Sequence, residues 1–272
     1  MKYYCFNGKI TNKQPEITPQ NRSFRYGDGV FETIKVFRNK ILLGDFHFDR
    51  LITSLSLLNI SVPESLSYDT LHKNILELCS RNNCPESARV RIAAYRDHDN
   101  HAASIIEAVP LDEKINKLNT EGWVVDLYPF AIKSMDAFAN LKSANYLPYV
   151  MADLYAKKNG MDECLVFNAD NNIADASKAN IFILVKDEVY TPALHQGCVN
   201  GVKRRFVIEQ LKHMGVAVRQ QEIHEAFLLE AEEVFLTNAI NDIRWVKSYR
   251  NKEFASSFTH EFYQKVFSTI YR

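Results

Sequence analysis

A lysine in a mixed polar and apolar stretch is the first residue whose chemistry needs an explanation. Lys142 lies in the segment LKSANYLPYVMADLYAKKNG, residues 141–160, close to Asn145 and Tyr146. If burial disfavours the charged ammonium, its pKa falls, and the neutral amine can attack an aldehyde to form a Schiff base. Most lysines instead extend their charged end into solvent. The segment by itself leaves a nucleophile and a surface lysine as alternatives, and the surface lysine is the commoner case.

An aspartate ahead of an apolar strand is the second candidate. Asp175 follows the turn-forming residues Asp170-Asn171-Asn172 and precedes an apolar segment that contains Asn180. Its carboxylate can pair with a cationic ring nitrogen of a cofactor, or it can accept hydrogen bonds from the backbone of a turn. The residues around it support both interpretations equally.

A glycine-led helix start is a third candidate, for binding an anion. Gly201-Val202-Lys203 opens a predicted helix, where free N–H groups and the positive end of the helix dipole attract phosphate. Gly201 would also let the backbone approach a phosphate closely. The chain has neither a Walker motif nor a G-x-G-x-x-G sequence, and a plain helix start is the commoner interpretation.

Two more segments contain groups that bind phosphate in other proteins. In FLTNAIND, residues 235–242, the side chains of Thr237 and Asn238 and the turn amides after them are neutral donors. In GDFHFDRL, Arg50 shares a predicted helix with His47 and can form either a bidentate phosphate contact or a surface ion pair.

The elements that must position these residues alternate between helices and strands. Apolar periodicity predicts a helix at 47–60 with Asp45 as its N-cap, and Pro148 is placed near the first turn of another helix. Further helices are predicted at 68–81, 201–215 and 258–272, and strands at 88–96, 104–110, 123–130, 163–168, 180–185, 188–192 and 232–239.

A charged stretch at 111–122 separates two halves of this pattern. We therefore expect two α+β domains, an N-terminal one at 1–117 and a C-terminal one at 122–272. Apolar residues make up 46% of the 272, which is enough for a sizeable core.

Composition excludes several classes of function. The 33 basic and 33 acidic residues cancel, so the sequence does not indicate a nucleic-acid binder. No run approaches the ~20 apolar residues of a membrane helix, and the start lacks the apolar core of a signal peptide, so a cytoplasmic protein is predicted. The five cysteines are scattered, which favours neither a disulfide framework nor a metal site.

Six motifs stand in one order along the chain. They are YGDGVFETIKV (26–36), HFDRLITSL (47–55), KSANYLP (142–148), IADASKANIF (173–182), TPALHQGCVNGVKRRFV (191–207) and EEVFLTNAI (232–240). Together they resemble the class IV aminotransferases, the fold-type IV pyridoxal-phosphate enzymes, which include branched-chain and D-amino acid aminotransferases and 4-amino-4-deoxychorismate lyases. The resemblance implies a D-amino acid aminotransferase-like fold of two α+β domains with the cofactor between them, usually as a homodimer.

The resemblance assigns roles to the candidate residues. Lys142 carries pyridoxal 5'-phosphate as a Schiff base and moves the substrate Cα proton. Asp175 stands where the family has a glutamate, five residues before Asn180, and so reaches one methylene less far toward the ring nitrogen. Arg50 matches the phosphate-binding arginine, and Tyr146 matches a tyrosine directed toward the ring hydroxyl.

Two phosphate segments and a substrate surface follow from the same resemblance. Lys203 replaces a threonine that often follows the apolar residue at the helix start, so only its N–H carries over. Arg91 and Arg96 lie five apart on a strand, hence on opposite faces, and at most one faces a substrate carboxylate. The phosphate segments are Val202-Lys203 and Asn238-Ala239-Ile240, and the substrate residues are Phe31, Arg91 and Arg96.

These roles favour an aminotransferase that acts on an amino acid and a 2-oxo acid. A 4-amino-4-deoxychorismate lyase, which releases pyruvate and 4-aminobenzoate, is the first alternative. The four-residue spacing from Lys142 to Tyr146 favours the lyase or the D-amino acid branch over a typical branched-chain enzyme. A catalytically silent protein on the same fold is the second alternative, supported by Asp175 and Lys203 and opposed by the retained Lys142.

Overall fold

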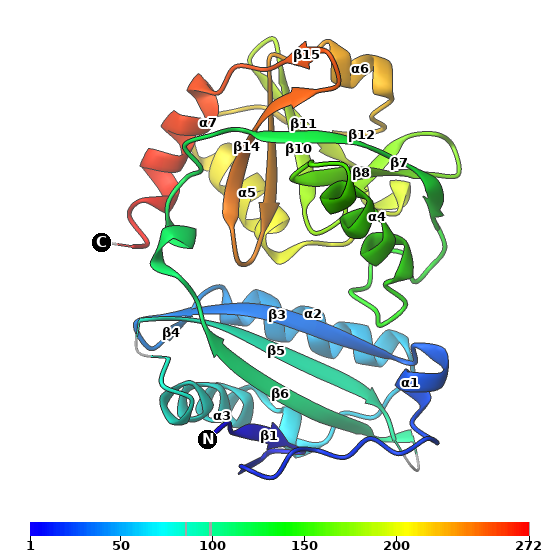
Figure 1. The fold of residues 1–272 in the computed structure, drawn as a ribbon, viewed down its shortest axis with the longest axis vertical. Helices are drawn as coiled ribbons and strands as arrows, with labels where there is room; N and C mark the ends of the chain where they lie inside the picture. The colour runs from blue at the N-terminus through cyan, green and yellow to red at the C-terminus, as the bar shows by residue number, and fades with distance from the viewer. Residues whose placement is uncertain (85, 98–99, 272) are drawn as a thin grey trace. The chain divides into compact units, whose positions relative to one another are not determined.

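The computed structural model describes residues 1–84, 86–97 and 100–271 (Figure 1). The chain forms two compact units, Met1–Ile115 with Leu141–Asn145, and Asn116–Asn140 with Tyr146–Arg272. Both contain helices and strands, as the α+β prediction required. The sequence placed the junction between residues 117 and 122, whereas the first unit ends at Ile115 and also includes the segment that carries Lys142. Within the described ranges, no helix has both the length and the apolar content that a membrane span requires.

The first unit is an antiparallel sheet with helices on one face. Its elements are β1 (Tyr4–Phe6), β2 (Lys9–Thr11), α1 (Arg22–Tyr26), β3 (Gly29–Phe37), β4 (Lys40–Ile41), α2 (Gly44–Leu57), the 3₁₀ turn Glu64–Leu66, α3 (Tyr68–Arg81), β5 (Ser87–Arg96) and β6 (Ala102–Pro110). The strand order is β2-β1-β6-β5-β3-β4. Val30 and Ile34 of β3 pack with Leu51 and Leu55 of α2 and with Ile75 of α3, and Figure 1 shows α2 against β3.

Helix α3 begins and ends where the periodicity predicted, at Tyr68 and Arg81. The Ser67 side chain accepts a hydrogen bond from the Thr70 N–H, which satisfies one of the unpaired donors of the first turn.

Helix α2 differs from its prediction at both ends. It spans Gly44–Leu57 instead of 47–60, and Asp45 lies in its first turn and does not cap it. The cap position is Leu43, whose backbone is left-handed (φ 54°). The side-chain signal for an N-cap was therefore misleading, because the preceding turn and not a capping carboxylate sets the start of this helix.

Strand β3 was not predicted from the sequence, although its residues are quoted in the first motif. Glu32 and Lys35 stand in it at 1% and 0% exposure, so polar side chains are buried on both faces of the strand. This pattern hides the alternation by which a half-buried strand is recognised.

The segment around Lys142 is held at the edge of β3. The Phe31 N–H donates to the Lys142 carbonyl (2.9 Å), and the Ala144 N–H donates to the Gly29 carbonyl (2.9 Å). A single antiparallel bridge, Val30 to Ser143, lies between these two bonds. Lys142 is thus placed by backbone pairing with the strand that carries Phe31.

The second unit is a larger sheet that curls. Its elements are β7 (Trp123–Lys133), α4 (Leu147–Lys158), β8 (Glu163–Asn168), β9 (Ile173–Ala176), β10 (Asn180–Val185), β11 (Glu188–Pro192), the 3₁₀ turn Leu194–Gln196, α5 (Val202–His213), β12 (Val218–Gln221), α6 (Glu225–Leu229), β13 (Glu233–Asn238), β14 (Asp242–Tyr249), β15 (Lys252–Glu253) and α7 (Ser257–Phe262). The path is β12-β11-β10-β13-β14-β7-β8-β9, with β15 on β14. The Ile173 N–H of β9 donates to the carbonyl of Ile223, just after β12, so the two ends of the path meet.

The curl creates an inner and an outer apolar layer. Along β10, which is buried throughout, Ile181 and Ile183 pack inside, whereas Phe182 and Leu184 face α5. Helix α4 packs its Ala152 against β8 on the same outer side. The side chains of Asp175, Asn180 and Thr237 lie on this outer side.

Every strand predicted in this unit is present, but β9, β12, β14 and β15 were not predicted, and the C-terminal helix differs from its prediction. Strands β8, β10 and β11 have the predicted bounds. The helix predicted at 258–272 is an α-helix only over Ser257–Phe262 and continues as a π-helical turn at Tyr263–Phe267. The apolar pattern predicted a continuous amphipathic α-helix, and the wider turn lets Phe267 enter the core beside Phe262.

Gly27 lets the chain between α1 and β3 pass close to the Lys142 segment, and this yields a prediction. Its φ is +68°, and a Cβ there would lie 2.2 Å from the Asn145 side-chain oxygen. We expect Gly27→Ala to lower the free energy of unfolding by about 1–2 kcal/mol from backbone strain and further through the collision, measured by urea unfolding. Gly160→Ala is the control, because Gly160 has φ +70° with nothing within 4 Å of a Cβ. Equal losses in the two variants would contradict this account.

Candidate active site

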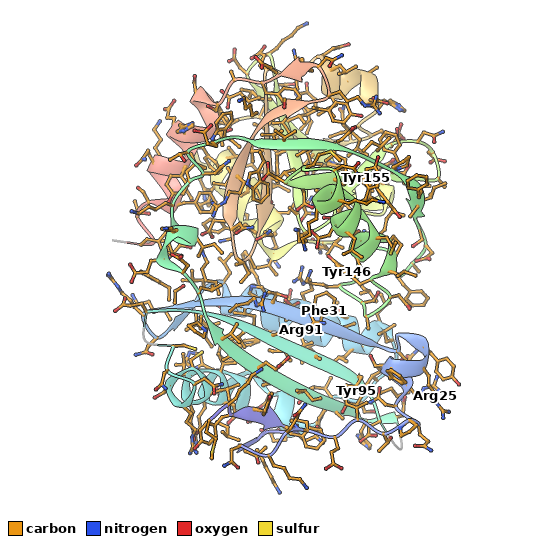
Figure 2. The ribbon with its side chains drawn as sticks, in the orientation of Figure 1. Arg25, Phe31, Arg91, Tyr95, Tyr146 and Tyr155 are labelled. Carbon is orange, nitrogen blue, oxygen red and sulfur yellow. The ribbon has the colours of Figure 1, made fainter. Side chains whose placement is uncertain are left out.

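In the first unit, Lys142 and Arg91 contact the same aromatic ring. The Lys142 Nζ lies 4.6 Å from the centroid of Phe31, and the Arg91 guanidinium lies 4.0 Å from it. Figure 2 labels Phe31 and Arg91 on the sheet of this unit. Lys142 is half-buried, so its amine is partly shielded from solvent without being sealed from reactants. A cationic side chain and a potentially nucleophilic one thus contact the same ring.

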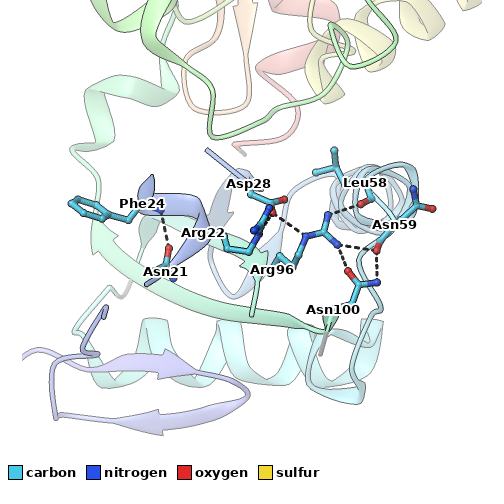
Figure 3. A network of polar contacts seen from close by, with 8 residues as sticks. All are labelled: Asn21, Arg22, Phe24, Asp28, Leu58, Asn59, Arg96 and Asn100. Atoms are coloured by element: carbon cyan, nitrogen blue, oxygen red, sulfur yellow. Dashed lines mark hydrogen bonds and ion pairs between the residues drawn. The ribbon is translucent and has the colours of Figure 1, made fainter. Parts of the chain in front are cut away.

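Arg96 lies on the other face of β5 and is surrounded by acceptors. Its guanidinium donates to Asp28 (2.9 Å), to the Leu58 carbonyl (2.7 Å), to the Asn59 carbonyl (3.1 Å) and to the Asn100 side chain (Figure 3). These partners tie the end of α2 to the end of β5. Of the two arginines predicted as substrate residues, Arg96 thus has the contacts of a structural residue, and Arg91 is the one near Lys142.

Arg50 forms a bidentate ion pair inside the first unit. Its Nε and one terminal nitrogen each lie 2.7 Å from an oxygen of Glu32, and the His47 Nδ1 lies 2.7 Å from the same carboxylate. Although burial opposes the charge of Glu32, Arg50 and His47 lower the pKa of Glu32 to about 2. The surface ion pair considered from the sequence is therefore a buried one, and it fixes the orientation of Arg50.

In the second unit, Asp175 is buried among three hydrogen-bond donors. Its Oδ2 accepts from the Tyr149 hydroxyl (2.8 Å) and from the Val199 N–H (2.7 Å), and its Oδ1 accepts from the Asn180 side-chain amide (2.7 Å). Burial raises the pKa of Asp175 to about 6, although these donors and the nearby Lys133 favour the charged form. Asp175 is therefore neither a surface residue nor a simple turn residue.

The start of α5 lies beside this carboxylate and is shaped for close backbone approach. A Cβ on Gly201 would lie 1.9 Å from the Asn180 side-chain oxygen, so only glycine fits there. In the part of the chain that is described, no side chain caps α5. The first N–H groups of this helix are those of Val202 and Lys203. The geometry suits an anion at the helix start.

A buried hydroxyl on the same face supports an anion there. Thr237 is register partner to Asn180, so their side chains share a sheet face. The Thr237 Oγ1 is buried, and across the described residues it has no hydrogen-bond partner. Because buried polar atoms are nearly always satisfied, this orphaned hydroxyl fits a missing polar ligand. The residues here therefore suit a phosphate-bearing group.

The side chain of Lys203 points into the protein. Its Nζ lies 2.6 Å from the Asp242 carboxylate, and both side chains are almost fully buried. This pair ties the start of α5 to the turn between β13 and β14. Lys203 would then contact a phosphate through its backbone N–H. This agrees with the sequence analysis, in which only the N–H carries over from the threonine that Lys203 replaces.

The turn after β13 uses some of its own donors. The Asn238 side-chain oxygen accepts from the N–H groups of Ile240 (3.0 Å) and Asn241 (2.7 Å). The N–H of Ile240, predicted as a phosphate ligand, is thus already bonded within the turn. Asn238, Ala239 and Ile240 are partly exposed.

Tyr146 precedes α4 and stacks on Tyr149, with ring centroids 4.5 Å apart. Figure 2 labels Tyr146 just ahead of the helix that carries Tyr155. Through Tyr149, the predicted ring-hydroxyl partner Tyr146 is linked to Asp175.

Several residues of these sites were not found from the sequence. Tyr149 follows Pro148 in an expected helix, Lys133 lies beyond the strand predicted at 123–130, and Glu32 is one residue of a motif. A carboxylate among the apolar residues Val30, Phe31 and Ile34 was the available signal for Glu32. Tyr149 had no such signal, because an aromatic residue on a helix is usually part of the core.

Comparison with known proteins identifies the class that this fold and these sites define. Residues 29–249 match the family described as amino-transferase class IV. The chain belongs to that family.

Relatives within the family carry different names. A putative branched-chain-amino-acid aminotransferase of Methanocaldococcus jannaschii is 26% identical over 89% of this chain and 86% of its own. An aminodeoxychorismate lyase of Bacillus subtilis is 28% identical over 87% of this chain and 83% of its own.

A solved structure confirms the fold predicted from the six motifs. The branched-chain aminotransferase of the archaeon Thermoproteus uzoniensis, solved with norvaline, superimposes with a TM-score of 0.87 at 23% identity, covering 99% of this chain and 94% of that one. This similarity extends over both units of the chain.

The ion pair of Glu32 gives a pH-dependent prediction. We expect Glu32→Gln to lower the free energy of unfolding at pH 7 by about 3 kcal/mol, because Arg50 loses its buried partner. The pKa of Glu32 is lowered by folding, so its contribution is complete above about pH 4.5 and is lost as the pH falls toward about 2. Urea unfolding across that range measures the difference between variant and wild type.

Glu77→Gln is the matched control, since Glu77 pairs with Arg81 on the exposed side of α3. Its effect should stay below about 0.5 kcal/mol. A Glu32→Gln penalty that is independent of pH would contradict the assignment of a buried charge.

Proposed function

We propose that this protein is a pyridoxal 5'-phosphate-dependent aminotransferase, in which Lys142 binds the cofactor covalently and the amino group moves from an amino acid to a 2-oxo acid. The observation that carries the proposal is the placement of Lys142. Backbone bonds fix it to β3, and its amine contacts the Phe31 ring, which Arg91 also contacts. Family membership supplies the context for that placement.

When bound, pyridoxal phosphate supplies an electrophilic carbon and an electron sink for the substrate's Cα electrons. The orphaned Thr237 hydroxyl and the open start of α5 suit its phosphate, and the buried Asp175 carboxylate suits its ring nitrogen. The residues proposed to bind it are Lys142, Arg50, Tyr146, Asp175, Val202, Lys203, Thr237, Asn238, Ala239 and Ile240.

Two groups of the chain handle protons in the proposed reaction. Asp175 holds the proton on the ring nitrogen, which requires the carboxylate in its charged form. With the cofactor bound, the Lys142 amine would serve as the base that takes the proton from the substrate Cα and would return it to the C4′ carbon of the cofactor. Because one lysine does both, its placement over Phe31 sets the geometry of both transfers.

Arg91 is the proposed partner of a substrate carboxylate. It is exposed, and it lies on the sheet face that carries Phe31 and Lys142. A guanidinium binds a carboxylate bidentately. Arg96 is left with its structural partners, so Phe31 and Arg91 are the substrate contacts of the first unit.

An aminodeoxychorismate lyase is a second candidate, favoured by the 28% identity to the Bacillus subtilis enzyme of that name. The same lysine and carboxylate would serve both reactions. Conversion of the cofactor to its amine form by L- or D-amino acids supports the aminotransferase. Pyruvate release from aminodeoxychorismate, without such conversion, would replace it by the lyase.

We further propose a homodimer, as the family resemblance implies. Helix α4 packs one face on the sheet and exposes a second apolar stripe, Leu147, Val150, Met151 and Leu154. A helix that is apolar on both faces is usually covered on both.

The stripe on α4 gives a test of the dimer. Leu154→Asp should raise the dimer dissociation constant by about tenfold or more, because one apolar side chain per copy is lost from the contact. Sedimentation velocity measures the change. Leu57→Asp, at similar exposure on α2, is the control and should leave the dimer intact. A wild-type chain that sediments as a monomer would contradict the proposal.

The role of Lys142 gives the direct prediction of this section. Lys142→Ala should lose the visible absorbance of the lysine-bound cofactor and all transamination, because no other amine replaces the covalent link. Lys158→Ala, at the exposed end of α4, is the control and should keep both. Retention of the absorbance in Lys142→Ala would disprove the assignment.

A further inference from the structure

The hydrogen bonds of Asp175 leave a defined part of its carboxylate for a ligand. Each carboxylate oxygen accepts about two hydrogen bonds. Among the described residues, Oδ2 accepts two, from Tyr149 and Val199, whereas Oδ1 accepts one, from Asn180. A ring N–H can therefore be accepted at Oδ1. Because Asp175 is one methylene shorter than the family's glutamate, the orientation of Oδ1 decides whether it can reach the ring nitrogen.

Tyr149 is built to hold this orientation. It is 4% exposed on the inner face of α4, and its ring stacks on Tyr146. The stacked ring restricts rotation of the side chain, so the hydroxyl stays directed at the Asp175 Oδ2, 2.8 Å away. Val199 and Asn180 donate from other elements, but only through a backbone amide and a short side chain whose positions the fold already sets.

The charged and titratable groups around Asp175 come from several elements. Lys133, from β7, donates to the Ala139 carbonyl (2.8 Å) and favours the charged carboxylate. Cys198, ahead of α5, stays a neutral thiol because burial raises its pKa to about 12. From α4, burial and Asp175 raise the pKa of Tyr149 well above its usual value, so its hydroxyl remains protonated and donates.

We propose that Tyr149 is a positioning residue for Asp175, whose hydroxyl fixes Oδ2 so that Oδ1 meets the cofactor's ring nitrogen. This inference rests on the proposed function. In this proposal, the hydrogen bond from Tyr149 compensates for the shorter reach of Asp175, whose side chain has one methylene less than the family's glutamate. It also explains why a tyrosine with a buried hydroxyl stands on the inner face of α4, where an apolar residue is usual.

Loss of the Tyr149 hydroxyl should change the charge of Asp175 in a measurable way. A hydrogen bond to a buried carboxylate favours its ionised form, so Tyr149→Phe should raise the pKa of Asp175 by about one to two units. Carboxyl ¹³C NMR of the full chain without cofactor follows this titration, and Asp175→Asn assigns the resonance. Tyr155→Phe is the control, because Tyr155 lies on the same helix and contacts Tyr128 and Phe130 instead.

The loaded enzyme tests positioning separately from charge. Tyr149→Phe should lower kcat with little change in KM and shift the acid limb of the kcat–pH profile upward, because a neutral Asp175 cannot hold the ring proton. In an Asp175→Glu background, whose longer side chain reaches unaided, the same substitution should have a much smaller effect. A purely structural tyrosine would weaken both backgrounds equally.

The outcomes separate the two claims. An unchanged Asp175 titration in Tyr149→Phe overturns the positioning role even if the enzyme binds pyridoxal phosphate and transaminates. Equal losses in the Asp175 and Asp175→Glu backgrounds also overturn it. Failure of the wild-type chain to bind the cofactor overturns the proposed function instead, whatever the titration shows.

Discussion

The buried carboxylate of Asp175 joins several elements on the outer face of the second unit through its hydrogen bonds. Burial alone would drive it to the neutral form. The described donors to it come from α4, from β10 and from the segment ahead of α5, and each of them favours the charged form. The glycine at position 201 belongs to the same constraint, because any larger residue would displace Asn180.

The two buried carboxylates of these sites show how partners decide charge. Glu32 faces two cationic side chains, Arg50 and His47, and its pKa falls to about 2. Burial raises the pKa of Asp175 to about 6, because its mostly neutral donors and the nearby Lys133 offset burial only in part. Glu32 is therefore charged at neutral pH and suits a structural role, whereas the pKa of Asp175 lies closer to neutral pH, so that a small change alters its protonation. Groups of the second kind are the ones that enzymes use.

The sequence predicted well those features that depend on local pattern. Helix α3 and strand β10 have the predicted bounds, because helical periodicity and a short apolar run suffice for them. Strand β3 was missed, since burial of Glu32 and Lys35 depends on partners distant in sequence. Lys142 was singled out by the order of motifs, not by its surroundings. Tyr149 was invisible, because only the fold reveals that its hydroxyl meets Asp175.

The covalent link to Lys142 remains the central claim, and one measurement tests it directly. The holoenzyme is reduced with borohydride, which makes the bond between lysine and cofactor permanent, and is then digested for peptide mass spectrometry. The account predicts the phosphopyridoxyl group on the peptide that contains Lys142. The same group on Lys133 or Lys203, two buried lysines of the second unit, or on no lysine at all, would contradict it.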